Sequence, residues 1–268
     1  MDNSINNQSI GFFDSGLGGL SVVEEVKKKL PNESIEYFAD NLNQPYGEKS
    51  HKQLVGFSIS IMDFLLSKKI KACVIACNTA TAASLTILQK QFPLPIIGMV
   101  APGVKHAISK TTNKKIGILA TEFTVKSEIY AREIKKFQSE FKVYSTYCPE
   151  CVAIVEEGKN NTPFAERIMS KYLLPLKKNK VDTLIIGCTH YAFLKDIIHE
   201  VMGEDVLIVD PAQSVAKELH KLLLCKGMLS ASGTPKQNYY TSGNRELVER
   251  IAGKILKRRK FSFQKIVL

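Results

Sequence analysis

Two short apolar runs, each followed at once by a cysteine, limit what this chain can fold into. Residues 74–80 read Val-Ile-Ala-Cys-Asn-Thr-Ala, and residues 184–190 read Leu-Ile-Ile-Gly-Cys-Thr-His. Each run is typical of a buried parallel strand that carries its cysteine into the next loop. Open α/β sheets bind ligands at the carboxyl ends of such strands. We therefore expect Cys77 and Cys188 to face one site from two halves of the chain.

Strand-like and helix-like segments alternate along the sequence, and this alternation favours an α/β fold with mostly parallel sheets flanked by helices. Strands are expected at residues 10–13, 35–39, 73–79, within 93–100, and at 115–120, 142–147, 183–187, 206–209 and 238–241. Helices are expected at residues 20–30, 51–67, 80–90, 163–177 and 214–224, with another beginning at 121–124.

Two Pro-containing breaks divide the pattern into two domains. The alternation restarts after Pro102-Gly103, and Asp210-Pro211 is where we expect the chain to return to its first half. The predicted domains are residues 1–99 plus 211–268 and residues 100–210.

The net charge of +11 would suit an anionic partner such as an acidic metabolite, a nucleic acid or a membrane surface. The basic residues are instead dispersed in short groups, and no aromatic residues are interleaved among them for base stacking. The groups are at residues 27–29, 68–69, 114–115, 135–136, 177–178 and 257–260. Solvated surfaces are therefore favoured over binding of nucleic acid or gyrase.

Residues 1–9 lack the basic start and apolar core of a signal peptide, and we expect a short disordered lead there. No segment is long and apolar enough for a membrane span. The protein is therefore expected to be cytoplasmic, with its six cysteines reduced and no contact with a membrane.

Cys148 and Cys151 form a C-x-x-C motif, which occurs in redox proteins and as one half of a zinc site. No second pair of Cys or His stands at zinc spacing, so no metal site is expected. A thioredoxin-like motif would follow the first strand and open a helix, which this position does not suggest. We expect two separate thiols in a loop or in the core.

Cys77 and Cys188 differ because each precedes the expected start of a helix, whose N–H groups stabilise a thiolate and lower its pKa. With a pKa of about 8.5, only roughly 3% of a thiol is ionised at pH 7. Two thiols across a cleft suit the removal of a proton from one face of a carbon and its delivery to the other. Buried apolar thiols are common, but that alternative leaves the matched polar neighbours unexplained.

A glycine-rich turn, residues 16–19, follows the first strand and offers backbone N–H groups to an anion. Its spacing is not that of dinucleotide-binding folds, and it lacks the lysine of a P-loop. Asp14, at the end of the strand, suits either an acid/base or ammonium-binding role or a helix cap. The residue types alone leave both roles open.

Six motifs, in chain order, resemble those of glutamate racemases in the cofactor-independent aspartate/glutamate racemase family. They are residues 13–19, 45–47, 76–80, 120–125, 187–191 and 240–243. The resemblance implies interconversion of L- and D-glutamate, which supplies D-glutamate for peptidoglycan synthesis, without a cofactor or metal. It also implies two pseudo-symmetric α/β domains with the active site in the cleft between them. A homodimer is expected, and aspartate is the alternative substrate.

The resemblance implies that Cys77 and Cys188 are the two acid/base catalysts, with Asp14 supporting Cys77 and His190 supporting Cys188. It pairs Cys77 with D-glutamate and Cys188 with L-glutamate. Glu156 matches a family glutamate near the second thiol, although the neighbouring Glu157 leaves that match open. Residues matching the substrate-holding positions are Asp14, Ser15, Tyr46, Gly47, Asn78, Thr79, Thr121, Thr124, Thr189 and His190. Unlike the family pattern, Ala192-Phe193 rather than Pro follows Tyr191.

Overall fold

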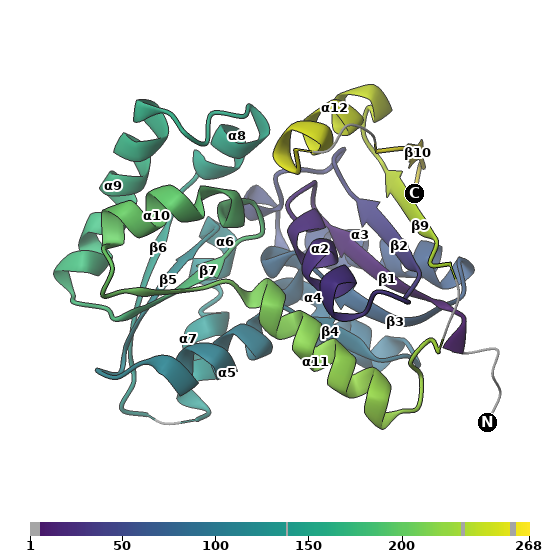
Figure 1. Cartoon of the computed structure of the whole chain (residues 1–268), viewed down its shortest axis with the longest axis horizontal. Helices are drawn as coiled ribbons and strands as arrows, with labels where there is room; N and C mark the ends of the chain where they lie inside the picture. Colours follow the sequence, from purple (N-terminus) through teal and green to yellow (C-terminus); the bar gives the residue numbers. More distant parts are fainter. Residues whose placement is uncertain (1–5, 138, 232–233, 258–260) are drawn as a thin grey trace.

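The structure is a computed structural model that describes residues 6–137, 139–231, 234–257 and 261–268. Most of the expected N-terminal lead, residues 1–5, and residues 258–260 of the last basic group lie outside the described residues. The strands form two sheets that lie in two lobes, side by side (Figure 1).

The first sheet has six strands in the order β10-β9-β2-β1-β3-β4, and all of their pairings are parallel. Its strands are β1 (Ser9–Asp14), β2 (Ile35–Ala39), β3 (Ile70–Ile75), β4 (Ile96–Gly98), β9 (Gln237–Thr241) and β10 (Phe263–Lys265). Residues near the C-terminus therefore complete the sheet that the N-terminal segment begins.

The second sheet has four parallel strands in the order β6-β5-β7-β8. Its strands are β5 (Lys115–Ala120), β6 (Lys142–Tyr147), β7 (Thr183–Gly187) and β8 (Leu207–Val209). This order repeats the order β2-β1-β3-β4 of the first sheet, so β3 and β7 occupy equivalent places. The two parallel sheets flanked by helices confirm the predicted α/β fold.

Helices cover both sheets (Figure 1). Those of the first lobe are α2 (Leu20–Lys29), α3 (His51–Ser67), α4 (Asn78–Gln91), α11 (Pro211–Cys225) and α12 (Arg245–Ile255), with a short 3₁₀ turn η1 (Tyr46–Glu48). Those of the second lobe are α5 (Val100–Lys110), α6 (Glu122–Lys126), α7 (Ile129–Lys135), α8 (Cys151–Glu156), α9 (Pro163–Lys178) and α10 (Lys195–Met202), with η2 (His190–Leu194).

The central strands of the first sheet are buried on both faces, which explains their largely apolar sequences, although β2 contains Glu36 and β3 contains Lys71. Phe12 and Val74 pack in one core cluster with residues of α2 and α11. Phe13 and Cys73 point to the other face and pack with residues of α3 and α4. This double covering fixes the positions where β1 and β3 end, and the site residues follow there.

Several boundaries differ from the predicted ones. Strand β3 ends at Ile75 rather than at residue 79, because Cys77 already caps α4. Pro102 does not interrupt the chain but lies in the first turn of α5, where its missing N–H costs no hydrogen bond. Strand β1 begins at Ser9, inside the segment predicted as a lead. Helices α5, α7, α8, α10 and α12 and strand β10 were not predicted.

Candidate active site

One cavity of about 450 Å³ receives both cysteines that follow β3 and β7. The predicted site residues that line it are Ser15, Tyr46, Gly47, Cys77, Asn78, Thr79, Thr121, Glu156, Cys188, Thr189 and His190. The other two, Asp14 and Thr124, lie behind this wall and contact residues in it. The structure thus brings together residues from the ends of strands in both sheets.

Cys77 is the N-cap residue of α4 and is 5% exposed. Its Sγ accepts a hydrogen bond from the Ala80 N–H at 3.4 Å and donates one to Ser15 Oγ at 3.8 Å. Burial raises the pKa of Cys77, the Asp14 carboxylate raises it further, and the Ala80 N–H only partly opposes them. The predicted lowering of this pKa is therefore wrong: desolvation outweighs the helix N-terminus, and Cys77 carries its proton at neutral pH.

Asp14 is fully buried and contacts both lobes. Its Oδ2 accepts hydrogen bonds from the Gly19 N–H at 2.9 Å and the Gly16 N–H at 3.4 Å. Its Oδ1 accepts one from Thr189 Oγ1, next to the second thiol, at 3.4 Å. Asp14 therefore does hold the start of the glycine-rich turn, as a cap would, and also reaches across to the neighbour of Cys188.

The glycine-rich turn allows the two lobes to approach each other closely. A Cβ atom on Gly18 would lie 2.8 Å from the backbone nitrogen of His190, a distance that real Cβ atoms do not reach. The glycine is therefore needed where the turn meets the η2 segment of the second lobe.

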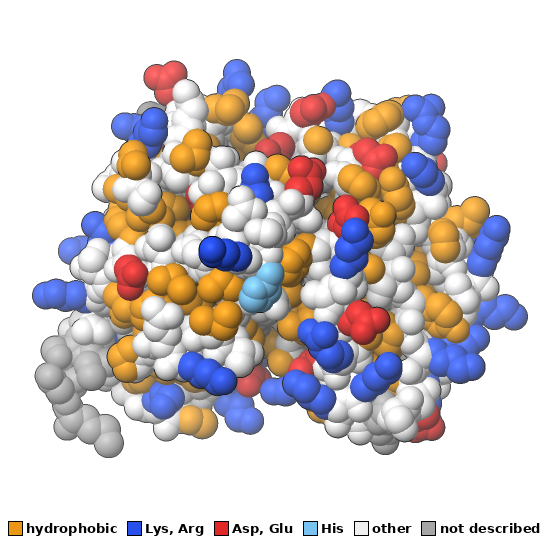
Figure 2. All heavy atoms as spheres, turned by 180° about the vertical axis from the view of Figure 1, so that it is seen from behind, with side chains coloured by type: hydrophobic (Ala, Val, Ile, Leu, Met, Phe, Trp, Pro, Cys, Tyr) orange, Lys and Arg blue, Asp and Glu red, His pale blue; other side chains and the backbone are white. Residues whose placement is uncertain are grey.

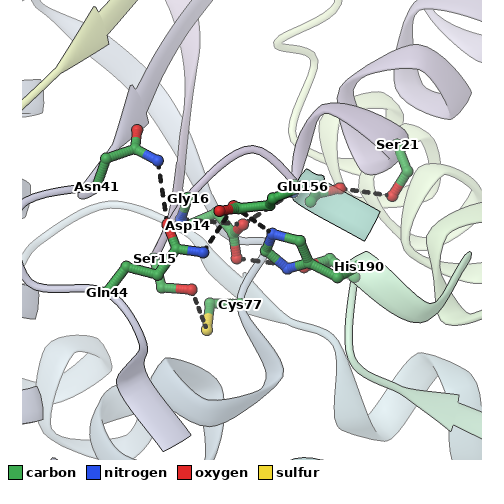
Figure 3. A network of polar contacts seen from close by, with 12 residues as sticks. Asp14, Ser15, Gly16, Ser21, Asn41, Gln44, Cys77, Glu156 and His190 are labelled. Atoms are coloured by element: carbon green, nitrogen blue, oxygen red, sulfur yellow. Dashed lines mark hydrogen bonds and ion pairs between the residues drawn. The ribbon is translucent and has the colours of Figure 1, made fainter. Parts of the chain in front are cut away.

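His190, Glu156 and Cys188 form a buried polar group beside the second thiol (Figure 3 shows the first two). His190 Nε2 lies 3.1 Å from Glu156 Oε1. Burial alone would lower the pKa of His190, but its hydrogen bonds with Cys188 and Glu156 raise that pKa to about 10. At neutral pH an imidazolium therefore lies between Cys188 and the Glu156 carboxylate. Glu157, the alternative match, pairs with Lys159 at 2.6 Å.

Three threonines connect the lobes on the opposite side of the cavity. Thr79 Oγ1 lies 2.8 Å from Thr121 Oγ1 and 3.3 Å from Thr124 Oγ1, and the latter two lie 2.9 Å apart. Because each hydroxyl both donates and accepts, the cluster can reorient its protons to suit a bound anion.

Asn78 presents a buried donor with no partner among the described residues. Its Oδ1 accepts a hydrogen bond from Tyr130 OH at 2.7 Å, while its Nδ2 has no acceptor in the part of the chain that the structure describes. Asn78 is 2% exposed and lines the cavity. A buried unpaired amide donor is costly, and a ligand oxygen would satisfy it.

Tyr46 is anchored rather than free. Its hydroxyl donates to Asp40 Oδ2 at 2.6 Å, and Asp40 Oδ1 accepts from Ser242 Oγ at 2.7 Å. Ser242 belongs to the segment after β9, so the C-terminal part of the chain fixes the loop that contains Tyr46 and Gly47.

Two residues of the site were missed in the sequence. Tyr130 orients Asn78 from α7, and Gln44 donates from its Nε2 to Glu156 Oε1 at 2.7 Å. Gln44 directly precedes the predicted 45–47 motif, and that adjacency was the one available signal. Tyr130 lies in a segment without any such motif.

Cys148 and Cys151 are joined by a disulfide, with their Cα atoms 5.6 Å apart. The prediction of two separate, reduced thiols is therefore wrong. The motif follows β6 and opens α8, and this helical turn brings the two Cα atoms within disulfide range. Cys148 also lines the cavity.

Basic side chains are spread over the surface. Figure 2 shows Lys and Arg on all sides of the visible face, interleaved with acidic and apolar groups. Among the described residues, no helix has the length and apolar character to cross a membrane.

The two lobes, with a thiol from each in one shared cavity, define a two-lobed α/β protein with a paired-cysteine site. A family model described as Asp/Glu/Hydantoin racemase matches residues 19–219. The chain belongs to this family and is an isomerase of the racemase type.

Curated and solved relatives resemble the chain over nearly its whole length. A glutamate racemase of Pediococcus pentosaceus is 40% identical over 249 residues, which cover 92% of this chain and 94% of the relative. The crystal structure of a glutamate racemase from Bacillus anthracis matches with a TM-score of 0.95 and 38% identity, covering 98% of both chains. The structure of the Francisella tularensis glutamate racemase in complex with D-glutamate matches with a TM-score of 0.91 and 31% identity, again covering 98% of both.

Proposed function

We propose that the protein interconverts L- and D-glutamate by a cofactor-independent proton transfer between Cys77, Cys188 and the substrate α-carbon. The observation that carries this proposal is that both thiols line one cavity from equivalent strand ends of two sheets. The printed names of the curated and solved relatives support glutamate as the substrate.

The two thiols act as opposed acid and base. For L-glutamate, the Cys188 thiolate takes the α-proton and becomes a thiol, while the Cys77 thiol gives its proton to the other face of the carbanion. For D-glutamate the roles are reversed, with Cys77 as the base. Each turnover thus moves one proton from carbon to sulfur and one from sulfur to carbon. Acid–base catalysis of this kind contributes about 10²–10⁴-fold.

The electrostatics of the site favour one resting state. Burial and Asp14 raise the pKa of Cys77, so Cys77 carries its proton before substrate binds and is the acid in this state. This arrangement is ready for L-glutamate. Proton exchange with solvent produces the opposite state for D-glutamate.

Both lobes supply groups for the substrate. The free Nδ2 of Asn78 suits a carboxylate oxygen, and the threonine cluster of Thr79, Thr121 and Thr124 supplies further donors. Ser15, Tyr46, Gly47 and Thr189 complete the proposed substrate-binding set, and Asp14 and His190 supply the charges near the ammonium group and the reacting thiol. We assign residues 1–99 plus 211–268 to one domain and residues 100–210 to the other.

The proposed role is cytoplasmic and biosynthetic. A racemase of this kind would supply D-glutamate for peptidoglycan, and so for cell-wall biogenesis and cell shape. We expect the protein to act as a homodimer.

The test is incubation with each enantiomer in D₂O, followed by circular dichroism and mass spectrometry. We expect the optical signal of either enantiomer to decay to zero, with one deuterium gained at the α-carbon. Cys77→Ser and Cys188→Ser should each slow this by about 10²–10⁴-fold. Cys225→Ser, which changes an exposed thiol at the end of α11, is the matched control. Unchanged optical signals with both enantiomers would refute the activity, and faster inversion of aspartate would reassign the substrate.

A further inference from the structure

Gln44 links the first lobe to the polar group that supports Cys188. Its Nε2 donates to Glu156 Oε1 at 2.7 Å, and the same carboxylate oxygen lies 3.1 Å from His190 Nε2. Figure 3 shows Gln44 and His190 converging on Glu156 from different segments of the chain. One carboxylate oxygen is thus contacted from the loop after β2 and from the turn after β7.

The orientation of the Gln44 amide is fixed by its other end. Asn41 Nδ2 donates to Gln44 Oε1 at 3.1 Å, so the Gln44 nitrogen must face Glu156. Asn41 in turn accepts a hydrogen bond from Thr241 Oγ1 at 3.0 Å. A chain of contacts therefore runs from strand β9 through Asn41 and Gln44 to Glu156.

Close packing also restricts where the Gln44 side chain can lie. A Cβ atom on Gly16 would lie 2.6 Å from Gln44 Oε1. The absence of a side chain at Gly16 therefore makes room for the amide over the glycine-rich turn. Gln44 lies between that turn and Glu156, and it lines the cavity.

We propose that Gln44 is a positioning residue of the proton-transfer site: from the first lobe it fixes the Glu156 carboxylate, and through it the His190 imidazolium beside Cys188. The inference rests on the two-cysteine reaction proposed above. It makes the position of the Glu156 and His190 side chains depend on contact between the lobes.

Charge explains why an amide suits this position. Glu156 is 22% exposed in its side chain, and its burial raises its pKa, but hydrogen bonds from His190 and Gln44 bring that pKa below its usual value. An amide donor stabilises the carboxylate without a competing positive charge, so among the described residues His190 remains the one cation paired with it.

The other ionisable groups around this pair stay the same when Gln44 is changed. Those that face Glu156 or His190 are Cys188, Asp14 and Tyr37, with Lys254 of α12 packed beside Gly158 at the end of α8. A change in the titration of Glu156 in a Gln44 variant is therefore assigned to the lost contact.

The test compares Gln44→Met, which keeps the length but removes the donor, and Gln44→Glu, which adds a negative charge. Gln89→Met is the matched control, because Gln89 lies on α4, does not line the cavity, and donates one hydrogen bond to Ile96 O of β4. We expect Gln44→Met to lower kcat/KM about tenfold, the loss typical of one charge-assisted hydrogen bond. L- and D-glutamate have equal free energies in water, so kcat/KM must fall equally in both directions.

The readout specific to positioning is pH dependence. Loss of the donor should raise the pKa of Glu156, so the acidic limb of the kcat/KM profile should move to higher pH, and further for Gln44→Glu. The ¹³C carboxyl resonance of Glu156 can be assigned by its loss in Glu156→Gln. This resonance should titrate at higher pH in Gln44→Met and in Gln44→Glu than in the unmodified protein. In Gln89→Met its titration should be unchanged. In the Glu156→Gln background, adding Gln44→Met should cost little more.

The outcomes separate the two proposals. If the unmodified protein does not invert glutamate, the proposed function fails, and the carboxyl titration still tests the contact between Gln44 and Glu156. If it inverts glutamate but Gln44→Met and Gln44→Glu leave both the acidic limb and the Glu156 titration unchanged, the positioning role of Gln44 is wrong.

Discussion

Tyr130 OH donates a hydrogen bond of 2.7 Å to Asn78 Oδ1, and this contact turns the amide nitrogen of Asn78 into the cavity. The donor comes from α7 in the second lobe and the acceptor from α4 in the first. A contact between the lobes thus orients the Asn78 Nδ2. This nitrogen is the one buried side-chain donor of the cavity wall that has no partner among the described residues.

Tyr130→Phe should therefore weaken substrate binding more than chemistry. Without the hydroxyl, the Asn78 amide can turn, and its carbonyl oxygen loses a buried partner. We expect KM for glutamate to rise about tenfold, equivalent to about 1.4 kcal/mol and within the range for a lost buried hydrogen bond. Steady-state kinetics in both directions would measure this, and an unchanged KM together with a reduced kcat would contradict it.

The raised pKa of His190 has a consequence for stability. A group whose pKa is higher in the folded than in the unfolded protein adds stability that is complete below its unfolded pKa, about 6.5, and is lost as pH rises through the folded value. For His190 the folded value is about 10. The unmodified protein should therefore have a higher free energy of unfolding than His190→Asn. This difference should be larger at pH 6 than at pH 10.

Denaturant unfolding across that pH range measures the difference. His106→Asn is the control, because burial lowers the pKa of His106 and Lys217 adds to this effect. Its contribution changes only on the acidic side of neutrality, so the His106→Asn difference should be flat between pH 7 and 10. A flat curve for His190→Asn as well would mean that the imidazolium is absent.

Gly18→Ala should impair the reaction by moving the lobes apart. The new Cβ would meet the His190 backbone nitrogen at 2.8 Å. Because a displacement of about 1 Å at a reacting group costs about 100-fold, we expect a fall of at least about tenfold in kcat/KM.

Gly56→Ala provides the matched substitution, since a Cβ there meets nothing within 4 Å. Gly56 lies inside α3, so this change should raise the free energy of unfolding by about 0.8–1.0 kcal/mol and leave turnover unchanged. Equal kinetics for the two variants would show that the turn tolerates a side chain.

Thiol counting tests the disulfide between Cys148 and Cys151. The remaining cysteines are Cys73, Cys77 and Cys188, which are buried, and Cys225, which is exposed. In protein purified without reductant, alkylation of the folded protein should label Cys225. After denaturation, alkylation should label all four of these free cysteines. Denaturation with reductant should label all six. Intact-protein mass spectrometry distinguishes the cases, and six labels without reductant would rule out the disulfide.

The strand ends were predictable because their physics is local. Apolar runs at residues 72–76 and 184–186 mark strands buried on both faces, and the cysteine that follows each run lies near the end of the strand. The end of β3 was misplaced because a cysteine, an asparagine and a threonine suit a strand end and a helix start equally well.

The remaining errors have different physical causes. Gln44 and Glu156 are 112 positions apart, and nothing in the local sequence of either shows that they meet. The disulfide depends on the start of α8, a short helix with no sequence signal strong enough to predict it. Pro102 looked like a break because proline is excluded from helix interiors, but the first turn accepts it.

The chain passes between the lobes twice, once from β4 into α5 and once from β8 into α11. The two passages touch: a Cβ on Gly103 would lie 3.0 Å from Pro211 Cγ. Two adjacent covalent connections restrict the movement of one lobe relative to the other more than a single connection would. Because Cys77 and Cys188 belong to different lobes, these two connections limit how far the two thiols can move apart.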